Sequence, residues 1–161
     1  MIYLALGSNL GDREAQLAAA RAALEVEGVR IITQSSLYET PALLPDGAGL
    51  DWDKAYYNQV IAVETSLEAP ELLALAKRIE AAQGREDRGR WAPREVDIDI
   101  LDYRGEVLES EALCLPHYAM SQRDFVLVPL QEIAPDWQYP STQQPIAALI
   151  AALPKQEVKR L

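Results

Sequence analysis

The pattern of apolar and polar positions along the chain predicts short strands alternating with two amphipathic helices. Leu17, Ala20 and Leu24 recur at the spacing of one helix face, and an equivalent stripe runs from Leu72 to Ile79. Segments rich in Val, Ile, Tyr and Thr between turn-forming residues predict strands. The expected elements are a strand at 1–7, a helix ending near residue 27, strands at 29–39 and 57–65, a helix from Pro70 to just before Gly84, and a strand at 94–103.

This β-α-β-β-α-β order predicts a ferredoxin-like α+β fold, in which two helices pack on one face of an antiparallel sheet. A C-terminal extension should follow, with a turn at Arg104–Gly105, an apolar run at 125–130 and a helix at 145–152. The irregular segment 41–53 predicts a long binding loop. The 161 residues are expected to form a single domain, 1–161.

Composition narrows the classes of function. A net charge of -10 and a pI near 4.6 argue against nonspecific nucleic-acid binding, which needs a basic face. The sequence shows neither a bilayer-spanning apolar run nor the features of a signal peptide, so we expect a cytoplasmic protein without a membrane partner. Cys114 is the single cysteine, which excludes an internal disulfide, and we expect it to be a buried apolar residue. The ligand should therefore be a small molecule.

Two aspartates at alternate positions form the first candidate site. Side chains two residues apart on a strand point to the same face, so Asp97 and Asp99 should lie side by side while Ile98 and Ile100 cover the other face. Two close carboxylates repel, and either a raised pKa or a cation relieves the repulsion. Hard oxygen ligands suit Mg²⁺, which is the interpretation we favour. The alternative is that both aspartates belong to the solvated face of a half-exposed strand.

An arginine-rich loop precedes these aspartates. Residues 84–94 contain four arginines and two acidic residues, a local charge of +2. Because guanidinium groups bind phosphate oxygens in a forked geometry, the loop predicts polyphosphate binding, unless these are only solvated charges. The arginines are Arg85, Arg88, Arg90 and Arg94, and the pattern leaves open which of Arg88 and Arg90 contacts phosphate.

Two further motifs are weak on their own. The turn from Gly7 to Gly11 matches no nucleotide-binding glycine motif and could simply shape the chain between strand and helix. His117 is the only histidine, and a lone histidine is more often a structural or surface residue than a catalytic one.

Six motifs in order resemble those of the 6-hydroxymethyl-7,8-dihydropterin pyrophosphokinase family, and they run through most of the chain. They are residues 6–11, 36–41, 56–58, 78–80 with 84–85, 90–94 with 97–100, and 116–120 followed by Arg123 and Phe125. The resemblance implies a ferredoxin-like fold, two Mg²⁺ ions, and transfer of diphosphate from ATP to the pterin hydroxymethyl group, leaving AMP. We separately expect a monomer, although the sequence does not determine the oligomeric state.

The resemblance also implies roles for individual residues. The metal ligands would be Asp97 and Asp99, which would form the catalytic set with Arg85 and Arg94. The pterin would contact Thr40, Leu43, Tyr56, Asn58 and Phe125. ATP would contact Glu80, Arg85, Arg94, Ile100, His117, Tyr118 and Arg123. Our own hypothesis is that loops 41–53 and 85–93 close over both substrates and exclude water, with Trp91 as part of the seal.

The chain departs from the family pattern at Lys77, Ala112 and Cys114, so the adenine contacts are the least defined. Two rival functions are a noncatalytic domain that binds a metabolite and regulates a partner, and a metal-dependent nucleotide hydrolase that needs no pterin. The first predicts binding without turnover, and the second predicts ADP or phosphate as a product.

Overall fold

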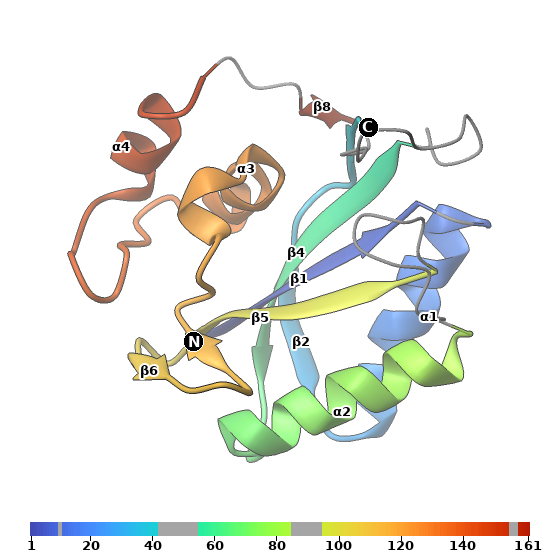
Figure 1. The fold of residues 1–161 in the computed structure, drawn as a ribbon. Helices are drawn as coiled ribbons and strands as arrows, with labels where there is room; N and C mark the ends of the chain where they lie inside the picture. The colour runs from blue at the N-terminus through green and yellow to red at the C-terminus, as the bar shows by residue number, and fades with distance from the viewer. Residues whose placement is uncertain (10, 42–54, 85–94, 155–157) are drawn as a thin grey trace.

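The computed structural model describes residues 1–9, 11–41, 55–84, 95–154 and 158–161. These residues form a domain of sheet and helices, and the strands of its central sheet are antiparallel (Figure 1). Its strands are β1 (Ile2–Ser8), β2 (Arg30–Gln34), β3 (Tyr38–Thr40), β4 (Tyr56–Glu64), β5 (Asp97–Tyr103) and β8 (Lys159–Arg160). The helices are α1 (Arg13–Val26), α2 (Ala69–Ala82), α3 (Asp124–Ile133) and α4 (Ile146–Ala151), and a short 3-10 turn spans Met120–Gln122.

The sheet has the order β5-β1-β4-β3-β8, with β2 also paired to β4, and each of these pairings is antiparallel. The predicted α+β architecture, with an antiparallel sheet covered by helices, is confirmed. A separate two-stranded sheet joins β6 (Leu108–Glu109) to β7 (Cys114–Leu115). Cys114 in β7 is only partly buried, so the expectation of a buried apolar residue is wrong, because this small sheet leaves the residue near solvent.

Two strand predictions need correction. The expected strand 29–39 is two strands, β2 and β3, separated by residues 35–37. At the break, the Ser35 hydroxyl accepts a hydrogen bond from the Val60 amide at 3.0 Å, in place of a backbone carbonyl. The expected strand 94–103 begins only at Asp97 within the described residues.

The register between β1 and β5 shifts by one residue. Leu4 pairs with Ile100 and Tyr3 pairs with Asp102, so Leu101 is skipped as in a β-bulge. Leu101 and Asp102 therefore both face α3 and α4, where Asp102 accepts a hydrogen bond from Trp137 Nε1 at 2.9 Å.

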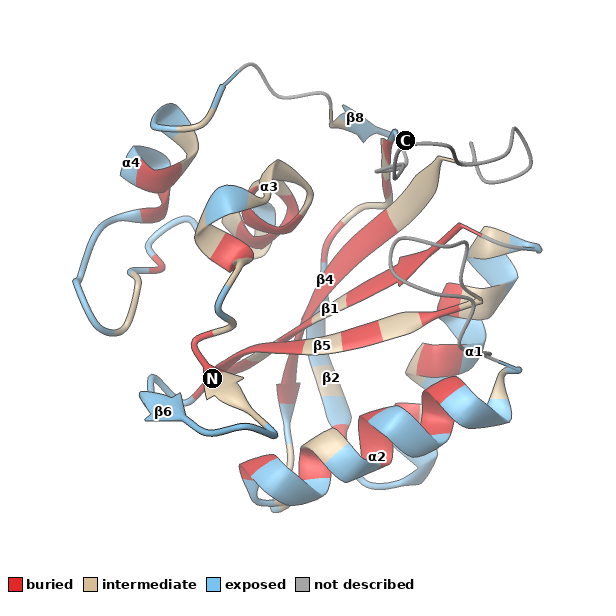
Figure 2. Ribbon diagram, in the orientation of Figure 1, coloured by how far each residue is buried: buried red, intermediate tan, exposed pale blue. Residues whose placement is uncertain are grey.

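Apolar side chains are buried on both faces of the sheet. In Figure 2, buried residues are marked along the central strands and on the helices. On the helix face, which packs on α1 and α2, Leu4, Leu6 and Ile98 meet Leu17 and Leu72. The pocket face, which packs on α3 and α4, buries Val60 and Leu101 against residues such as Val126, Leu127, Leu130, Ile146 and Leu149. The run 125–130, predicted only as apolar, is thus part of a helix that covers the second face.

Local sequence explains where the helices begin. Asp12 caps α1 by accepting a hydrogen bond from the Ala15 amide at 3.1 Å. A capping box between Glu68 and Glu71, with Pro70 in the first turn, starts α2. None of the helices in the described part of the chain has the length and apolarity needed to cross a lipid bilayer.

Candidate functional site

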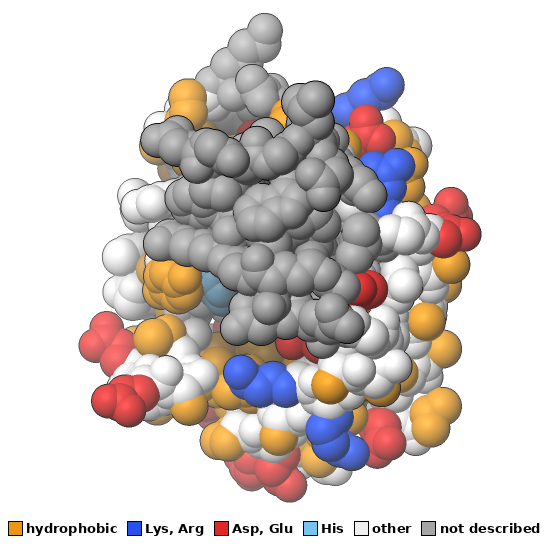
Figure 3. Space-filling view, turned by 45° about the vertical axis from the view of Figure 1, so that its right-hand side comes forward, with side chains coloured by type: hydrophobic (Ala, Val, Ile, Leu, Met, Phe, Trp, Pro, Cys, Tyr) orange, Lys and Arg blue, Asp and Glu red, His pale blue; other side chains and the backbone are white. Residues whose placement is uncertain are grey.

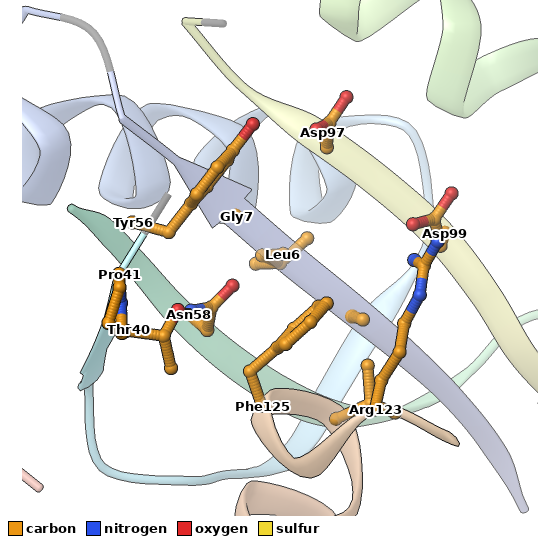
Figure 4. Close-up of a pocket in the computed structure, with 12 residues that line it drawn as sticks. Leu6, Gly7, Thr40, Pro41, Tyr56, Asn58, Asp97, Asp99, Arg123 and Phe125 are labelled. Carbon is orange, nitrogen blue, oxygen red and sulfur yellow. Dashed lines mark hydrogen bonds between the residues drawn. The ribbon is translucent and has the colours of Figure 1, made fainter. Parts of the chain in front are cut away.

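One pocket lies where the pocket face of the sheet meets the first turn of α3 (Figure 4). Strands β1, β3, β4 and β5 and helix α3 all contribute to it. It is lined by Ala5, Leu6, Gly7, Thr40, Pro41, Tyr56, Asn58, Asp97, Asp99, Arg123, Phe125 and Val126. Seven of the residues predicted from the sequence therefore come together here from distant parts of the chain: Thr40, Tyr56, Asn58, Asp97, Asp99, Arg123 and Phe125.

The two aspartates stand on the first and third residues of β5. Both are partly exposed in the pocket, while Ile98 and Ile100 between and after them are buried on the helix face. From that opposite face, the buried Glu80 carboxylate of α2 accepts a hydrogen bond from the Ile98 amide at 2.8 Å. Helix α2 thus holds the backbone between the two carboxylates, which fixes their position without closing them off from solvent.

His117 lies beside Asp99. Its Nε2 is 4.0 Å from Asp99 Oδ1, and its Nδ1 accepts a hydrogen bond from the Ala119 amide at 3.2 Å. The pKa of His117 is lowered, chiefly by burial. The negative charge of Asp99 opposes this shift, and the positive charge of Arg123 adds to it. A neutral ring with its proton on Nε2 follows, so that the N–H is directed toward the aspartate side of the pocket.

A buried amide forms the floor of the pocket. Asn58 donates from Nδ2 to the Thr40 hydroxyl at 2.8 Å, which fixes the orientation of the amide. A Cβ atom built on Gly7 would lie only 3.2 Å from Asn58 Oδ1, so the neighbouring glycine leaves room for that oxygen. The amide keeps its carbonyl oxygen and one N–H for other partners, a combination that can read an edge carrying both donors and acceptors.

Aromatic rings and one guanidinium stand above this floor. Tyr56 comes from β4, and Phe125 comes from the first turn of α3 (Figure 4). Arg123, which precedes that helix, has its Cζ 5.5 Å from the Phe125 ring centroid. A flat heterocycle would find both apolar faces and a polar edge in the same pocket.

Other predicted residues lie elsewhere. Ile100 is buried in the core of the helix face, where its side chain has no access to the pocket. Tyr118 is 74% exposed and stacks on His117 with the ring centroids 4.9 Å apart. Leu43, Arg85, Arg88, Arg90, Trp91 and Arg94 lie outside the described residues, as do the predicted loops 41–53 and 85–93 except for Pro41.

Sequence reasoning missed several lining residues: Ala5, Leu6, Gly7, Pro41 and Val126. Leu6, Gly7 and Pro41 belong to the motifs at 6–11 and 36–41, and Pro41 opens the predicted loop 41–53, but the sequence assigns none of the three an individual contact. On the face shown in Figure 3, described basic and acidic side chains are interspersed and form no continuous basic surface.

Comparison with known proteins identifies what the chain is similar to. A family model described as 7,8-dihydro-6-hydroxymethylpterin-pyrophosphokinase matches residues 3–135. The 2-amino-4-hydroxy-6-hydroxymethyldihydropteridine pyrophosphokinase of Methylorubrum extorquens is 46% identical over 136 residues, covering 83% of this chain and 82% of that protein. The protein of the same description from Haemophilus influenzae is 42% identical over 142 residues, with 88% and 86% covered.

Solved structures share the fold. The Plasmodium falciparum HPPK-DHPS with pteroate superposes with a TM-score of 0.71 at 15% identity, covering 99% of this chain. This chain spans 47% of that longer chain, and at such low identity the likeness concerns the fold alone.

Proposed function

Because the chain belongs to the 7,8-dihydro-6-hydroxymethylpterin-pyrophosphokinase family, we propose that the pocket between the sheet and α3 is its active site. The protein is a pyrophosphokinase of folate biosynthesis, which transfers diphosphate from ATP to the hydroxymethyl group of 6-hydroxymethyl-7,8-dihydropterin and leaves AMP. One observation carries the assignment of the site: a fixed, buried amide lies in the same pocket as two aromatic rings and two carboxylates.

The pterin would occupy the amide end of the pocket. Asn58, held by Thr40, would pair with the donors and acceptors along the ring's polar edge. Tyr56 and Phe125 would contact the faces of the ring. Because the amide is already oriented, little entropy would be lost in aligning it with the substrate. By resemblance, we also assign pterin contacts to main-chain groups at Thr40 and Leu43.

Asp97 and Asp99 fit a magnesium site. They are accessible carboxylates on one strand face, and the described residues contain no cluster of three or more His, Cys, Asp or Glu that could form a closed cage. That donor set suits Mg²⁺, which is commonly held by one or two carboxylates together with water and substrate phosphates. When bound, the two ions we propose would offset phosphate charge and lower the pKa of the attacking hydroxyl.

The remaining residues would orient ATP. His117 would donate its Nε2–H toward the phosphates beside Asp99, and Arg123 would add positive charge at the α3 side. Tyr118 stacks on the histidine and would limit its rotation. By resemblance we also assign phosphate contacts to Arg85 and Arg94, and the ATP site to Glu80 and Ile100. Both of these side chains are buried. ATP would therefore have to contact the backbone at Ile100, and the backbone or the end of α2 at Glu80.

Positioning accounts for most of the chemistry required. Transfer of a phosphoryl or diphosphoryl group needs the hydroxyl, the phosphorus and the leaving oxygen in line, with charge neutralised around them. Asn58 and the two aspartates line the same pocket, so a pterin bound at Asn58 would have its hydroxymethyl group near phosphates bound at the aspartates. We further propose that residues 1–161 form one domain and that the protein is a cytoplasmic monomer. Sedimentation analysis tests the oligomeric state.

A product assay tests the proposal. Purified protein with ATP, Mg²⁺ and 6-hydroxymethyl-7,8-dihydropterin should form AMP and pterin diphosphate in equal amounts, separated by chromatography, and no AMP without the pterin. ADP formed without pterin would instead indicate a nucleotide hydrolase, and pterin binding without turnover would indicate a regulatory binding domain.

A further inference from the structure

Glu132, near the C-terminal end of α3, is the hub of a polar cluster outside the pocket. Its carboxylate accepts hydrogen bonds from the Ser36 amide at 3.1 Å, the Ser36 hydroxyl at 3.0 Å and the Tyr38 hydroxyl at 2.6 Å. Arg160 of β8 approaches the same carboxylate to 3.7 Å. One side chain of α3 is therefore bonded to the segment that leads into β3.

Helix geometry connects this cluster to the pocket. Glu132 and Phe125 are seven residues apart, which places them on the same stripe of α3 and about 10 Å apart along its axis. Phe125 lines the pocket at one end of the stripe, and Glu132 is bonded to the sheet side at the other. Because a helix moves as a rigid rod, holding the Glu132 end of α3 against the sheet side constrains where Phe125 at the other end can lie.

The strand side of the cluster also leads to the pocket. Tyr38 is opposite Asn58 in the antiparallel pairing of β3 with β4, and Thr40, two residues further along the same face, accepts the hydrogen bond from Asn58. Glu132 is thus joined through Tyr38 to the strand that orients the pocket amide.

The pKa shifts of Glu132 and Tyr38 agree with the hydrogen bond between these two side chains. Burial tends to raise the pKa of Glu132, but the hydrogen bonds from Tyr38 and Ser36, with Arg160 nearby, hold it below its ordinary value. Burial together with the bond to Glu132 raises the pKa of Tyr38 to about 12. The carboxylate therefore stays ionised and the phenol stays protonated, which is the pairing that a charge-assisted hydrogen bond needs.

We propose that Glu132 is a positioning residue, which ties α3 to Ser36 and Tyr38 and so sets the separation between Phe125 and the Thr40–Asn58 pair across the pterin pocket. This inference rests on the proposed function, because it takes that pocket as the pterin site. Glu132 touches no substrate in this scheme, and its role is carried out through the two walls that it joins.

The test compares the binding of two ligands to Glu132→Gln. Glutamine keeps the size of the side chain, but its NH₂ group cannot accept from Ser36, so the bond between α3 and the β3 segment weakens. We expect the Kd for 6-hydroxymethyl-7,8-dihydropterin, measured by calorimetry, to rise on the order of tenfold to a hundredfold, while the Kd for α,β-methylene-ATP with Mg²⁺ is unchanged. Tyr38→Phe, which removes one donor, should produce a smaller shift in the same direction.

Glu71→Ala is the matched control, because it also removes a glutamate that bonds to a backbone amide but does so at the start of α2, away from the pocket. It should lower the melting temperature without changing either Kd. If Glu132→Gln bound pterin as tightly as the parent protein, or weakened both ligands equally, the positioning role would be refuted. If the parent protein bound no pterin at all, the proposed function itself would fail.

Discussion

The helix face and the pocket face of the sheet are built from the same strands, yet they differ in what they bury. The helix face packs apolar side chains of β1, β4 and β5 against α1 and α2, forming a continuous core. The pocket face has two parts. One part packs apolar residues against α3 and α4, and the other carries Asn58, Asp97 and Asp99 around an open pocket.

The comparison teaches that one strand can serve stability and chemistry at once. In β5, alternate residues enter the core and the pocket, so the core side chains Ile98 and Ile100 immobilise the backbone that carries Asp97 and Asp99. Glu80 adds to this from the helix face through the Ile98 amide. A rigid element is a better support for two repelling carboxylates than a loop would be.

The largest effect should come from removing a carboxylate of the pocket face. We expect Asp97→Ala to lower kcat on the order of 10³-fold, because it removes one of the two carboxylates proposed to hold the Mg²⁺ ions that would offset phosphate charge. Pterin affinity and the melting temperature should change little, since Asp97 is partly exposed and the core is untouched. Steady-state kinetics, pterin calorimetry and thermal unfolding provide the three readouts; near-normal turnover would sink the assignment.

The converse change is made on the helix face. Leu72 is fully buried between α2 and the sheet, so Leu72→Ala should lower the free energy of unfolding by about 2–5 kcal/mol. The KM for pterin should stay the same in the molecules that remain folded. Urea denaturation measures the first quantity and kinetics at low temperature the second. A large rise in KM would mean that the two faces are not separable.

The smallest effect concerns the orientation of the pocket amide. Thr40→Val keeps the shape of the side chain but removes the acceptor for Asn58 Nδ2, which leaves a buried donor without its bond. We expect the KM for pterin to rise about tenfold, equivalent to roughly 1.4 kcal/mol, with kcat less affected. Thr65→Val serves as the control, because it makes the same change of side chain just past the end of β4 that is far from the pocket. Equal KM values for Thr40→Val and the parent would show that the hydroxyl does not orient the amide.

Local sequence patterns are enough to predict much of the fold. The stripes at Leu17–Leu24 and Leu72–Ile79 predicted α1 and α2, and alternation in β5 predicted which side chains share a face with Asp97 and Asp99. These features depend on residues close together in the chain, where periodicity is a direct physical signal.

The features that could not be predicted depend on distant partners. The break between β2 and β3 arises because the Ser35 hydroxyl bonds to β4, and the Glu132 cluster joins residues nearly a hundred positions apart. Helix α3 contains Pro129, which weakened the helical signal, and its burial comes from the sheet rather than from its own pattern. Apart from Asp97 and Asp99, which alternation in the strand predicts, the pocket residues follow only from motif resemblance, since nothing local to Thr40 or Phe125 indicates that they meet.

The skipped residue in β5 has a consequence for how this strand tolerates changes of length. Leu101 is the extra residue at the register shift, so it stands outside the alternation that the residues on either side of it follow. Deleting Leu101 itself would restore plain alternation and leave Asp97, Asp99, Asp102 and Tyr103 facing as they do now, at the cost of one core side chain. Deleting Ile98 instead would make Asp97 and Asp99 direct neighbours and so place them on opposite faces, which means that the register shift at Ile100–Leu101 marks the place where β5 can best lose a residue.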